Sequence, residues 1–494
     1  MALTRYAKPG TLGDKAPEPN LNYDRIPKER YTSKEFMKLE WDHIWTKVWL
    51  RGGLSQDLQE PNSYVTTEIG NWSILITRGE DGKTRAFHNV CKHRGNTLAQ
   101  QPRGVLTDGT FKCGYHRWQY DAQGKLVEAP DPETFPQGVC DPSLHLDELP
   151  CEEWNGWIMY SLNPDVRPLD EWLGPVKDHL EAYNFDKMDL VMDMTVEWNC
   201  NWKASVDAFN ETYHVWGTHP QLMDWLDDQN VQIDLYDIHN RYLVPFGVPS
   251  PRPHIDQEVI GPNLEVYMEQ NGVDPKDFKG NAQEARRAIQ LAQRERADEM
   301  GWDFSSLNDD QLSDDYHYCV FPNVTLNTHA TNYMMFTQRP HTEDPNKCLY
   351  DLQMFSLPTD TNNKRTKQAT EAAESSAPSY MTVEDDKAPT VNPGMDEAVQ
   401  GEADASGRPE HIYIKDGEEH TLGEVLDQDA HNLPFVQKGM NSPAYRGLWC
   451  GEQERRIIHF HQVVDRLIME GGGQVPSYKA VSYTHLTLPT NREV

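Results

Sequence analysis

The sequence lacks any run of 18 apolar residues, which excludes a segment that would cross a membrane as a helix. Its first twenty residues, MALTRYAKPGTLGDKAPEPN, contain no apolar core of a signal peptide, so we expect a cytoplasmic protein. Cysteine is also scarce, with eight in 494 residues, and this number excludes a scaffold built on disulfides. We expect reduced thiols that are mostly structural.

Positive charge is in deficit along the chain. Lys and Arg number 46 against 78 Asp and Glu, which gives a formal net charge of −32. Such a surface repels phosphate backbones and anionic lipids, so nucleic acids and membranes are disfavoured as partners and a basic partner protein is favoured. With 37% hydrophobic and 10% aromatic residues, the chain has the composition of a folded globular protein with room for two or three domains.

Short strands dominate residues 48–165, and turns rich in Gly, Asp and Pro separate them. This pattern predicts a small antiparallel β domain. An amphipathic helix is predicted over 32–49, with Thr32 and Glu35 as a capping box. We therefore expect an N-terminal arm and helix over 1–47 that pack on the domain following residue 165.

Residues 166–480 mix strands and helices, which indicates a larger α+β domain. The elements predicted within it are a surface helix over 284–300, sheet strands over 317–357 and a last helix over 452–469. Residues 359–410 are rich in Ala, Ser, Thr, Glu and Asp, which predicts a mobile acidic insertion. The tail over 481–494, VSYTHLTLPTNREV, resembles a translated sequencing adapter, and we interpret it as an artefact rather than native sequence.

Two short segments, HNVCKHRGNTL over 88–98 and FKCGYHRWQYDAQGKL over 111–126, each contain one Cys and one His. The pairs are Cys91 with His93 and Cys113 with His116. A zinc site is the alternative, but structural zinc usually takes Cys-x2-Cys with His-x3-5-His. Mixed pairs on two loops suit a binuclear cluster in which one iron takes both thiolates and the other takes both imidazoles. Neutral imidazoles raise the reduction potential above that of an all-Cys cluster.

The motifs CKHRG and CGYHRWQYDAQGKL resemble the Rieske [2Fe–2S] signature, C-x-H followed by C-x2-H. The resemblance implies a cluster held by Cys91, His93, Cys113 and His116. Two positions that are not ligands differ from the usual form, since Gly114 stands where Pro is frequent and Arg117 stands where Gly is frequent. These differences can alter the rigidity of the loop and the potential without removing a ligand.

The segment NWKASVDAFNETYHVWGTHP, residues 201–220, predicts a helix with two stripes. The apolar stripe consists of Trp202, Val206, Phe209, Tyr213 and Trp216, and the polar stripe consists of Lys203, Asp207, Glu211 and His214. Polar side chains beside a core stripe need partners, although a helix edge that faces solvent is the alternative. His219 lies off the helical face of His214, and Gly217 between them would let the helix unwind until the imidazoles converge. Two convergent imidazoles and a carboxylate form the facial triad of non-haem Fe(II) oxygenases.

The carboxylate is predicted from residues 422–439, LGEVLDQDAHNLPFVQKG. The apolar stripe of this predicted helix consists of Leu422, Leu426, Leu433 and Val436. Asp429 falls on the stripe, whereas Asp427 points away from it. A carboxylate on a core face is costly unless it meets a cation. From the residues alone, a capping or surface role for Asp429 is the alternative, and Pro434 leaves the register beyond it open.

The segment NETYHVWGTHP resembles the [D/E]-x2-H-x4-H motif in the large subunits of ring-hydroxylating oxygenases. DQDAHNLPFVQKG resembles the segment that carries the family's third iron ligand, and the resemblance extends to about residue 470. It implies that His214, His219 and Asp429 bind a mononuclear iron. It also implies an α+β fold in which the Rieske domain joins a helix-grip domain, an antiparallel sheet with helices. The family usually forms a head-to-tail trimer, with or without a separate β subunit.

Glu211 matches the family's acidic position that links a histidine of one subunit's cluster to an iron histidine of the next subunit. Most ring dihydroxylases have Asp here, and the longer Glu is similar to family members that oxidise quaternary amines. An ordinary surface Glu is the alternative. Asp207, one helical turn before Glu211, is a second candidate for the catalytic site or the subunit interface.

The resemblance implies a terminal oxygenase component. Electrons from NAD(P)H would reach the Rieske cluster through a ferredoxin or flavin reductase and then pass to the Fe(II), where O₂ is used. We expect cis-dihydroxylation or monooxygenation of an aromatic substrate, the commonest outcome in the family. The alternatives are a monooxygenase or demethylase of a quaternary amine or ether, a Rieske protein that only transfers electrons, and a zinc-stabilised interaction module.

Two further features predict no site. His459 and His461 alternate with apolar residues in a predicted helix, and we expect them in the core or on the surface. The run NYMMF, 332–336, is expected in the core of a sheet, where part of it could line a substrate pocket.

Overall fold

The computed structural model describes residues 15–106, 108–358 and 408–475. The predicted insertion over 359–410 lies outside these residues except for its last three positions, and the predicted tail over 481–494 lies wholly outside them. Within the described ranges, no helix is both long and apolar enough to span a membrane.

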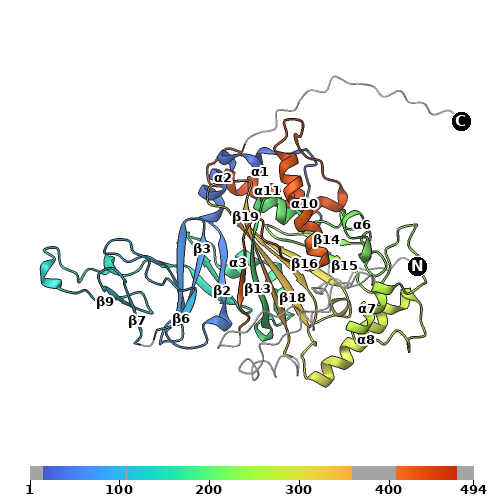
Figure 1. Ribbon diagram of the computed structural model, residues 1–494, viewed down its shortest axis with the longest axis horizontal. Coiled ribbons are helices and arrows are strands. Elements are labelled where there is room, and N and C mark those ends of the chain that lie inside the picture. Colours follow the sequence, from blue (N-terminus) through green and yellow to red (C-terminus); the bar gives the residue numbers. More distant parts are fainter. Residues whose placement is uncertain (1–14, 107, 359–407, 476–494) are drawn as a thin grey trace.

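Three antiparallel sheets form the N-terminal β region, which is blue to teal at the left of Figure 1. The five-stranded sheet consists, in spatial order, of β10 (Glu148–Leu149), β5 (Thr84–His88), β4 (Trp72–Arg78), β3 (Ser63–Ile69) and β6 (Arg103–Val105). The two three-stranded sheets are β11 (Cys151–Trp154), β12 (Trp157–Ser161) and β2 (Trp49–Leu54), and β7 (Thr110–Lys112), β8 (Gln119–Asp121) and β9 (Leu126–Glu128). The strands predicted from alternating residues are confirmed. In β3, for example, Val65 and Ile69 face the core while Glu68 faces solvent.

An eight-stranded sheet forms the centre of the larger domain. Its strands are, in order, β14 (Gln232–Leu235), β15 (Asn240–Val244), β16 (Asp315–Val320), β17 (Val324–Thr328), β18 (Asn332–Pro340), β19 (Cys348–Ser356), β13 (Asp189–Trp198) and β20 (His411–Ile414). Neighbouring strands are antiparallel except β13 and β20, which are parallel. Every residue of β16 is buried, so both faces of this strand are covered.

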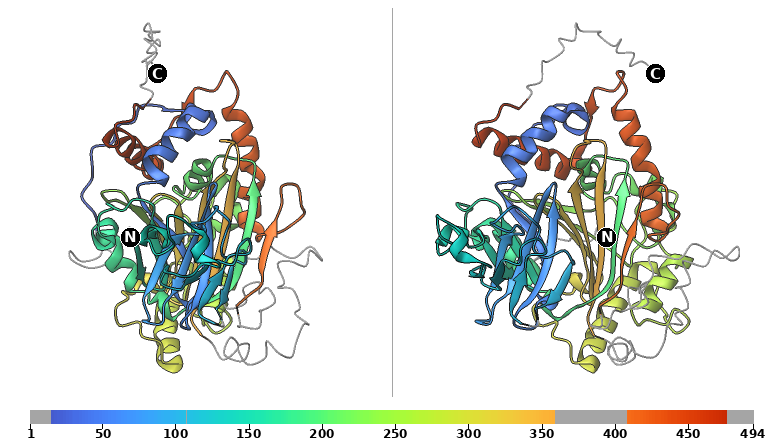
Figure 2. Two further views of the ribbon diagram at one scale, coloured as in Figure 1. Left: turned by 90° about the vertical axis from the view of Figure 1, so that its left-hand side faces the viewer. Right: turned by 60° about the vertical axis from the view of Figure 1, so that its left-hand side comes forward.

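Helices gather near one end of the large sheet, as Figures 1 and 2 show for α1, α2, α10 and α11. Their bounds are α1 (Glu29–Thr32), α2 (Lys34–Glu40), α10 (Glu424–Met440) and α11 (Arg455–Glu470). The remaining α-helices of the described residues are α3 (Leu169–Leu173), α4 (Pro175–Glu181), α5 (Trp202–Ala208), α6 (Val215–Thr218), α7 (Pro262–Gln270) and α8 (Ala282–Met300). Helix α5 packs on β18 and β19, and α10 packs on α5. The predicted α+β fold class is confirmed.

The N-terminal helix differs from the prediction at both ends. Ser33 rather than Thr32 caps α2, because the Ser33 hydroxyl accepts the backbone N–H of Phe36 at 3.0 Å. A π-helical turn, Trp41–Trp45, follows α2, and the chain has already entered β2 at Trp49. The predicted Thr32 capping box and the helical end at residue 49 were therefore wrong. A second hydroxyl one residue later supplied the cap instead.

Candidate cluster site and candidate iron site

Two loops bring the four predicted cluster residues together. Cys91 and His93 lie in the loop after β5, and Cys113 and His116 lie between β7 and β8. Both loops contain the same turn, since the carbonyl oxygens of Cys91 and Cys113 accept backbone N–H groups four residues later, at 2.9 and 3.0 Å. The two imidazole rings lie 4.5 Å apart between centroids.

The donor atoms of these residues fit a Rieske cluster. Nδ1 of His93 and Nδ1 of His116 are both buried, and neither has a hydrogen-bond partner among the described residues. Both thiols are buried as well, each 2% exposed. A buried polar nitrogen without a partner is costly unless something binds it. Two sulfur and two nitrogen donors in one buried place are the ligand set that a Rieske [2Fe–2S] cluster requires.

The charge states of these groups also suit metal binding. Burial lowers the pKa of His93, as do the neighbouring His116 and Arg94, so its imidazole is neutral. Burial and the adjacent Cys113 raise the pKa of Cys91. The pKa of Cys113 is lowered, because backbone N–H groups of Tyr115 and His116 outweigh its burial. A metal needs neutral imidazole and thiolate, and the two loops already favour these forms, the first at His93 and the second at Cys113.

Side chains that sequence reasoning missed surround the four candidates. The hydroxyl of Tyr120 lies 3.5 Å from Sγ of Cys91, and the amide of Asn96 donates to Sγ of Cys113 at 3.7 Å. Trp118 stacks on His93 with 4.9 Å between centroids. The alternation of Trp118 and Tyr120 along one face of a strand could have indicated their inward orientation.

Arg117 occupies a backbone conformation that favours glycine. Its φ is 63°, in the left-handed region, where a side chain costs about 1 kcal/mol. The sequence departs from the usual Rieske form at this same position. At Arg117 the loop therefore has a backbone conformation that suits the glycine frequent at this position.

The segment before the candidate iron site is not the single helix that the sequence predicted. Helix α5 ends at Ala208, and α6 begins only at Val215. Between the two helices, the Glu211 carboxylate accepts the backbone N–H of His214, the residue just before α6, at 3.0 Å. Tyr213 and Trp216, which the continuous helix would have buried, are 55% and 48% exposed.

Pro220 ends α6 and places His219. Proline disfavours helical backbone at the preceding residue, and His219 accordingly has a φ of −123° and a ψ of 58°. Gly217, which we expected to unwind the helix, lies inside α6. The imidazoles of His214 and His219 converge, 5.1 Å between centroids, because one short turn separates them. The two imidazoles converge as predicted, but the short α6 and Pro220 bring them together rather than an unwinding at Gly217.

Helix α10 brings Asp429 to these two histidines. Oδ1 of Asp429 lies 3.1 Å from Nε2 of His219 and 3.6 Å from Nε2 of His214. One ligand atom from each of the three residues lies within 4.8 Å of the others. The predicted stripe is buried at Leu426 and Leu433 of α10 and at Leu422, which precedes the helix. It is wrong at Val436, which is 44% exposed. Two imidazoles and one carboxylate on one side of a site fit a non-haem Fe(II).

Each imidazole is held by a different acceptor. Nδ1 of His214 is hydrogen-bonded to the Glu211 carboxylate, and Nδ1 of His219 lies 2.6 Å from the amide oxygen of Gln428. Gln221 donates to the same amide oxygen at 2.9 Å, which fixes its position. Acceptors at both Nδ1 atoms leave both Nε2 atoms free to bind a metal. Sequence reasoning missed Gln428 and Gln221, although Gln428 is the immediate neighbour of Asp429.

The site prefers a cation. Burial acts to lower the pKa of His214, but the carboxylates of Glu211 and Asp429 outweigh it and raise the pKa to about 9. A place that holds a proton this strongly also attracts a metal ion, which competes for the same nitrogen.

A cavity of about 110 Å³ opens beside the three candidate ligands. It lies between the sheet, the segment around α6, and the start of α10. Apart from Glu211 and the candidate ligands, its lining is mainly apolar or aromatic and includes Phe209, Trp225, Phe246, Met334 and Phe336. The cavity is smaller than the roughly 300–1,000 Å³ typical of sites for drug-sized ligands, which favours a compact substrate.

The other residues that sequence reasoning considered have buried partners. The hydroxyl of Tyr31 donates to Asp207 at 2.6 Å and lies 2.7 Å from Nε2 of His461. His459 lies 2.7 Å from the carbonyl of Tyr236. His459 and His461 are thus core residues, one of the two places expected for them. Asp207 belongs to the same buried network as His461, and its role in catalysis stays a prediction.

Comparison with known families decides the class of protein. Residues 48–144 match the Rieske [2Fe–2S] domain, and residues 185–400 and 402–470 match the catalytic domain of the ring hydroxylating alpha subunit. The chain belongs to the Rieske oxygenases. It is therefore an oxidoreductase of a family with a Rieske cluster and a mononuclear iron, as predicted. Because the catalytic-domain match covers more than half of the chain, a protein that only transfers electrons and a zinc module are not supported.

Several relatives of this Rieske oxygenase act on quaternary amines. It is 30% identical over 203 residues to the glycine betaine monooxygenase oxygenase subunit of Chromohalobacter salexigens. This match covers 41% of this chain and 44% of the relative. It is also 30% identical over 233 residues to the carnitine monooxygenase oxygenase subunit of Escherichia coli (strain K12), covering 46% of this chain and 59% of the relative. The match spans about half the length of these relatives. A solved quaternary ammonium Rieske monooxygenase shares the fold, with a TM-score of 0.61 and 16% identity over 91% of this chain and 100% of that one.

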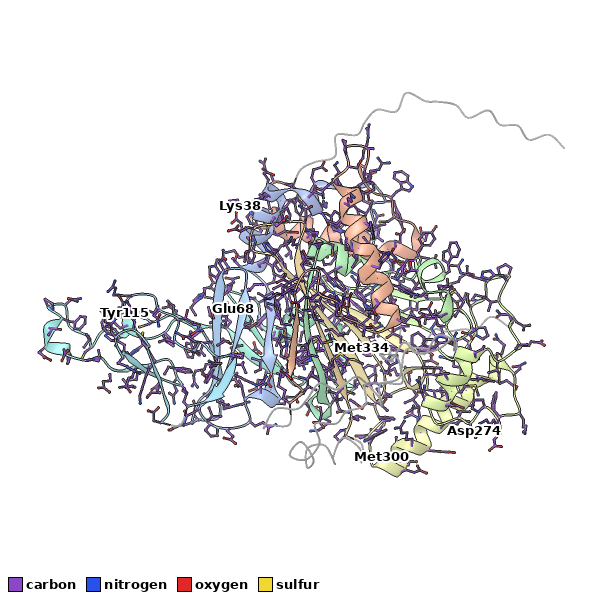
Figure 3. All side chains as sticks on the ribbon, in the orientation of Figure 1. Lys38, Glu68, Tyr115, Asp274, Met300 and Met334 are labelled. Carbon is purple, nitrogen blue, oxygen red and sulfur yellow. The ribbon has the colours of Figure 1, made fainter. Side chains whose placement is uncertain are left out.

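Within one chain of this Rieske oxygenase, the two candidate metal sites lie far apart. In Figure 3, Tyr115, which precedes the cluster candidate His116, lies well to the left in the N-terminal β region. Met334, which lines the cavity beside the candidate iron ligands, lies at the centre of the large sheet. The surface at the iron site is accessible, since the side chains of His214 and Glu211 are 25% and 10% exposed.

Proposed function

We propose that this Rieske oxygenase is the terminal component of a monooxygenase that oxidises a small quaternary ammonium compound. Cys91, His93, Cys113 and His116 are proposed to hold the [2Fe–2S] cluster, and His214, His219 and Asp429 to hold the mononuclear iron. When bound, these groups supply one-electron transfer and O₂ activation. A ferredoxin or flavin reductase is proposed to deliver the electrons, ultimately from NAD(P)H.

The separation of the two sites supports electron transfer between subunits. Electrons cross protein only over short distances, and the two candidate sites of one chain are at distant parts of the molecule. Glu211 is held at His214, beside the accessible edge of the iron site. A second copy of the chain could therefore place its cluster loops against this edge, with Glu211 joining a histidine of each copy. A cyclic trimer closes such a head-to-tail contact.

A quaternary ammonium substrate is supported better than the aromatic substrate that we first expected. The relatives named above act on glycine betaine and carnitine, both compact zwitterions that contain a quaternary ammonium group. Glu211 occupies the position at which most ring dihydroxylases have Asp. The cavity combines small volume with aromatic rings, and aromatic faces attract quaternary ammonium groups. The observation that carries the proposal is this combination of a small aromatic cavity with the carboxylate-rich site beside it.

The test is substrate-dependent consumption of NADH with a surrogate reductase. The panel consists of choline, glycine betaine and carnitine, with toluate and naphthalene as aromatic compounds. We expect coupled consumption with at least one ammonium compound, and ¹⁸O₂ should place one labelled atom in the organic product and the other in water. Consumption with aromatic compounds alone, with both labelled atoms in one diol, would contradict the proposal.

Two aspartates of α10 provide a matched control. Asp429→Ala should abolish turnover while the visible spectrum of the [2Fe–2S] cluster stays unchanged. Asp427 instead accepts the backbone N–H of Leu422 at 2.7 Å at the start of the helix, so Asp427→Ala should cost about 1 kcal/mol of stability without loss of iron. Equal iron content in the two variants would refute Asp429 as a ligand.

A further inference from the structure

The cavity contains a third carboxylate that the candidate iron site does not use. Asp315 begins β16, lines the cavity and is 2% exposed. Its Oδ2 accepts a hydrogen bond from the amide of Asn327 at 2.7 Å. Its Oδ1 is buried and has no hydrogen-bond partner among the described residues. A buried carboxylate oxygen without a partner is costly, so its retention beside a cavity indicates that a ligand interacts with it.

The protein groups around Asp315 do not neutralise it with a direct ion pair. Nε2 of His329 lies 4.0 Å from Oδ1, and burial lowers the pKa of His329 to about 4, so this imidazole is neutral near pH 7. Arg456 favours the ionised form of Asp315 from a distance, but it donates to Asn240 at 2.6 Å. The neighbouring Asp314 pairs with Arg286 and repels the charge on Asp315.

The remainder of the cavity suits the methyl groups of an ammonium ion. The rings of Phe209, Trp225, Phe246 and Phe336 line it together with the carboxylate. A quaternary ammonium group has no N–H to donate, so it is bound by ring faces and by a carboxylate at van der Waals distance. A neutral aromatic compound would leave the Asp315 oxygen buried and unsatisfied.

We propose that Asp315 recognises the positive charge of a small N-methylated ammonium substrate, whose methyl groups pack against the aromatic rings of the same cavity. This inference rests on the proposed function and deepens it, because it assigns the selection of a cationic substrate to one residue. Asp315 would be a specificity-determining residue that contacts substrate without binding the iron.

The charge of Asp315 depends on pH in a range that is easy to study. Burial raises its pKa to about 7, against the opposing effects of Asn327, Arg456 and the Thr328 backbone. Above pH 7 the free carboxyl is ionised and attracts the cation; below pH 7 it is protonated and the attraction is lost. The preference for a cationic ligand should therefore fall as the pH decreases through about 7. The other titratable groups around Asp315 and the cavity include Asp314, His329, Arg456, Glu211, the three candidate iron ligands and the tyrosines Tyr242, Tyr267 and Tyr318.

The experiment compares ligands that differ only in a charged nitrogen and a neutral carbon. Equilibrium binding to the holoenzyme is measured for choline against 3,3-dimethylbutan-1-ol and for glycine betaine against 3,3-dimethylbutanoate. The wild type should bind at least one ammonium ligand about tenfold or more tightly than its carbon counterpart, and Asp315→Asn should lose that preference. The control is Asp314→Asn, which removes a neighbouring carboxylate that does not line the cavity. Arg286 loses its ion pair with Asp314 but keeps the one with Asp310 at 2.6 Å, so this variant should retain the preference.

The outcomes separate the inference from the proposed function. A preference that survives in Asp315→Asn overturns the inference and leaves the proposed function standing. No preference in the wild type overturns both. Loss of the preference in Asp315→Asn supports the inference even if the bound cations are not oxidised, a result that would refute the proposed function alone. Should Asp315→Asn fail to fold, a wild-type preference that does not change between pH 5.5 and 8.5 would overturn the inference.

Discussion

At the scale of single residues, the candidate iron site uses one charged and one neutral acceptor. Glu211 binds Nδ1 of His214, and Gln428 binds Nδ1 of His219. An amide oxygen can only accept, so it requires the hydrogen on Nδ1 and leaves Nε2 free. The carboxylate has the same effect and also adds negative charge to the ring. The two imidazoles should therefore differ in basicity, with His214 the stronger donor.

Gln428 gives the first prediction. Gln428→Leu removes the acceptor, so His219 is no longer held in one orientation, and iron affinity should fall about 10- to 100-fold. Chelator competition on the purified protein measures this affinity, and the visible spectrum shows whether the [2Fe–2S] cluster remains. Gln428→Glu keeps an acceptor and should bind iron about as well as the wild type. Equal affinity in the Leu variant would show that Gln428 has no orienting role.

Residue types could be predicted at this scale, but their partners could not. Asp429 was identified because it falls on an apolar helical stripe and matches a family segment. Gln428 was missed because it lies more than 200 residues after His219 in the chain, and nothing in its neighbouring residues shows that the two side chains meet. Asp315 was missed for the same reason, since its significance depends on Asn327 and on the cavity.

At the scale of secondary structure, breaks in the elements matter as much as the elements. Helix α5 ends at Ala208, and the short α6 then separates His214, at its start, from His219, at its end. Hydrophobic periodicity predicted the helix but not its break, because periodicity records spacing and not the bond between the Glu211 carboxylate and the backbone just before α6. His239 provides a similar link elsewhere. Its Nδ1 accepts the backbone N–H of Phe321 at 2.9 Å, and its Nε2 donates to the carbonyl of Trp172 at 2.9 Å.

His239 gives the second prediction, which concerns stability against pH. Burial lowers its pKa to about 3, against an ordinary value of 6.5. The unfolded chain therefore takes up a proton below pH 6.5 that the folded chain refuses. The resulting stability is present above pH 6.5 and is lost as the pH falls toward 3, at about 1.4 kcal/mol per unit.

The test compares the wild type with His239→Gln, whose amide can also accept and donate. The free energy of unfolding of the large domain is measured by denaturant unfolding at pH 7, 6 and 5. It should fall with decreasing pH less steeply in the variant than in the wild type, and the two slopes should differ by about 1.4 kcal/mol per pH unit. Other buried histidines, such as His179 and His459, contribute equally to both proteins. Identical slopes would show that His239 takes up its proton equally in both states.

At the scale of the whole molecule, the cluster loops and the catalytic cavity lie in different parts of one chain (Figures 1 and 3). This arrangement suits a ring of subunits in which each cluster serves a neighbour. The net charge of −32 suits a reductase with a basic docking surface, and such docking should weaken as salt is added.

Complementation between subunits gives the third prediction. Cys113→Ser should lose the cluster, and Asp429→Ala should lose the mononuclear iron, so each variant should be inactive alone. Co-expressed in one cell, the two should form mixed assemblies in which an intact cluster faces an intact iron site. Turnover in the purified mixed assembly would then be restored to a fraction of the wild-type rate. Mixing the two proteins after separate assembly is the control, and an inactive co-expressed assembly would refute transfer between subunits.

The sequence by itself determined the family, the candidate ligands and their short spacings, because C-x-H, C-x2-H and H-x4-H are local patterns with few chemical explanations. It also determined the α+β class, since periods of two and 3.6 residues are local as well. Only the tertiary structure decided which acceptor holds each imidazole, where α5 breaks, and that Asp315 lies unsatisfied beside the cavity. The Gln428 contact and the Asp315 environment join segments distant in the chain, and such contacts leave no trace in the spacing of neighbouring residues. The contact of Glu211 with His214 is local, but it depends on side-chain geometry that hydrophobic spacing does not record.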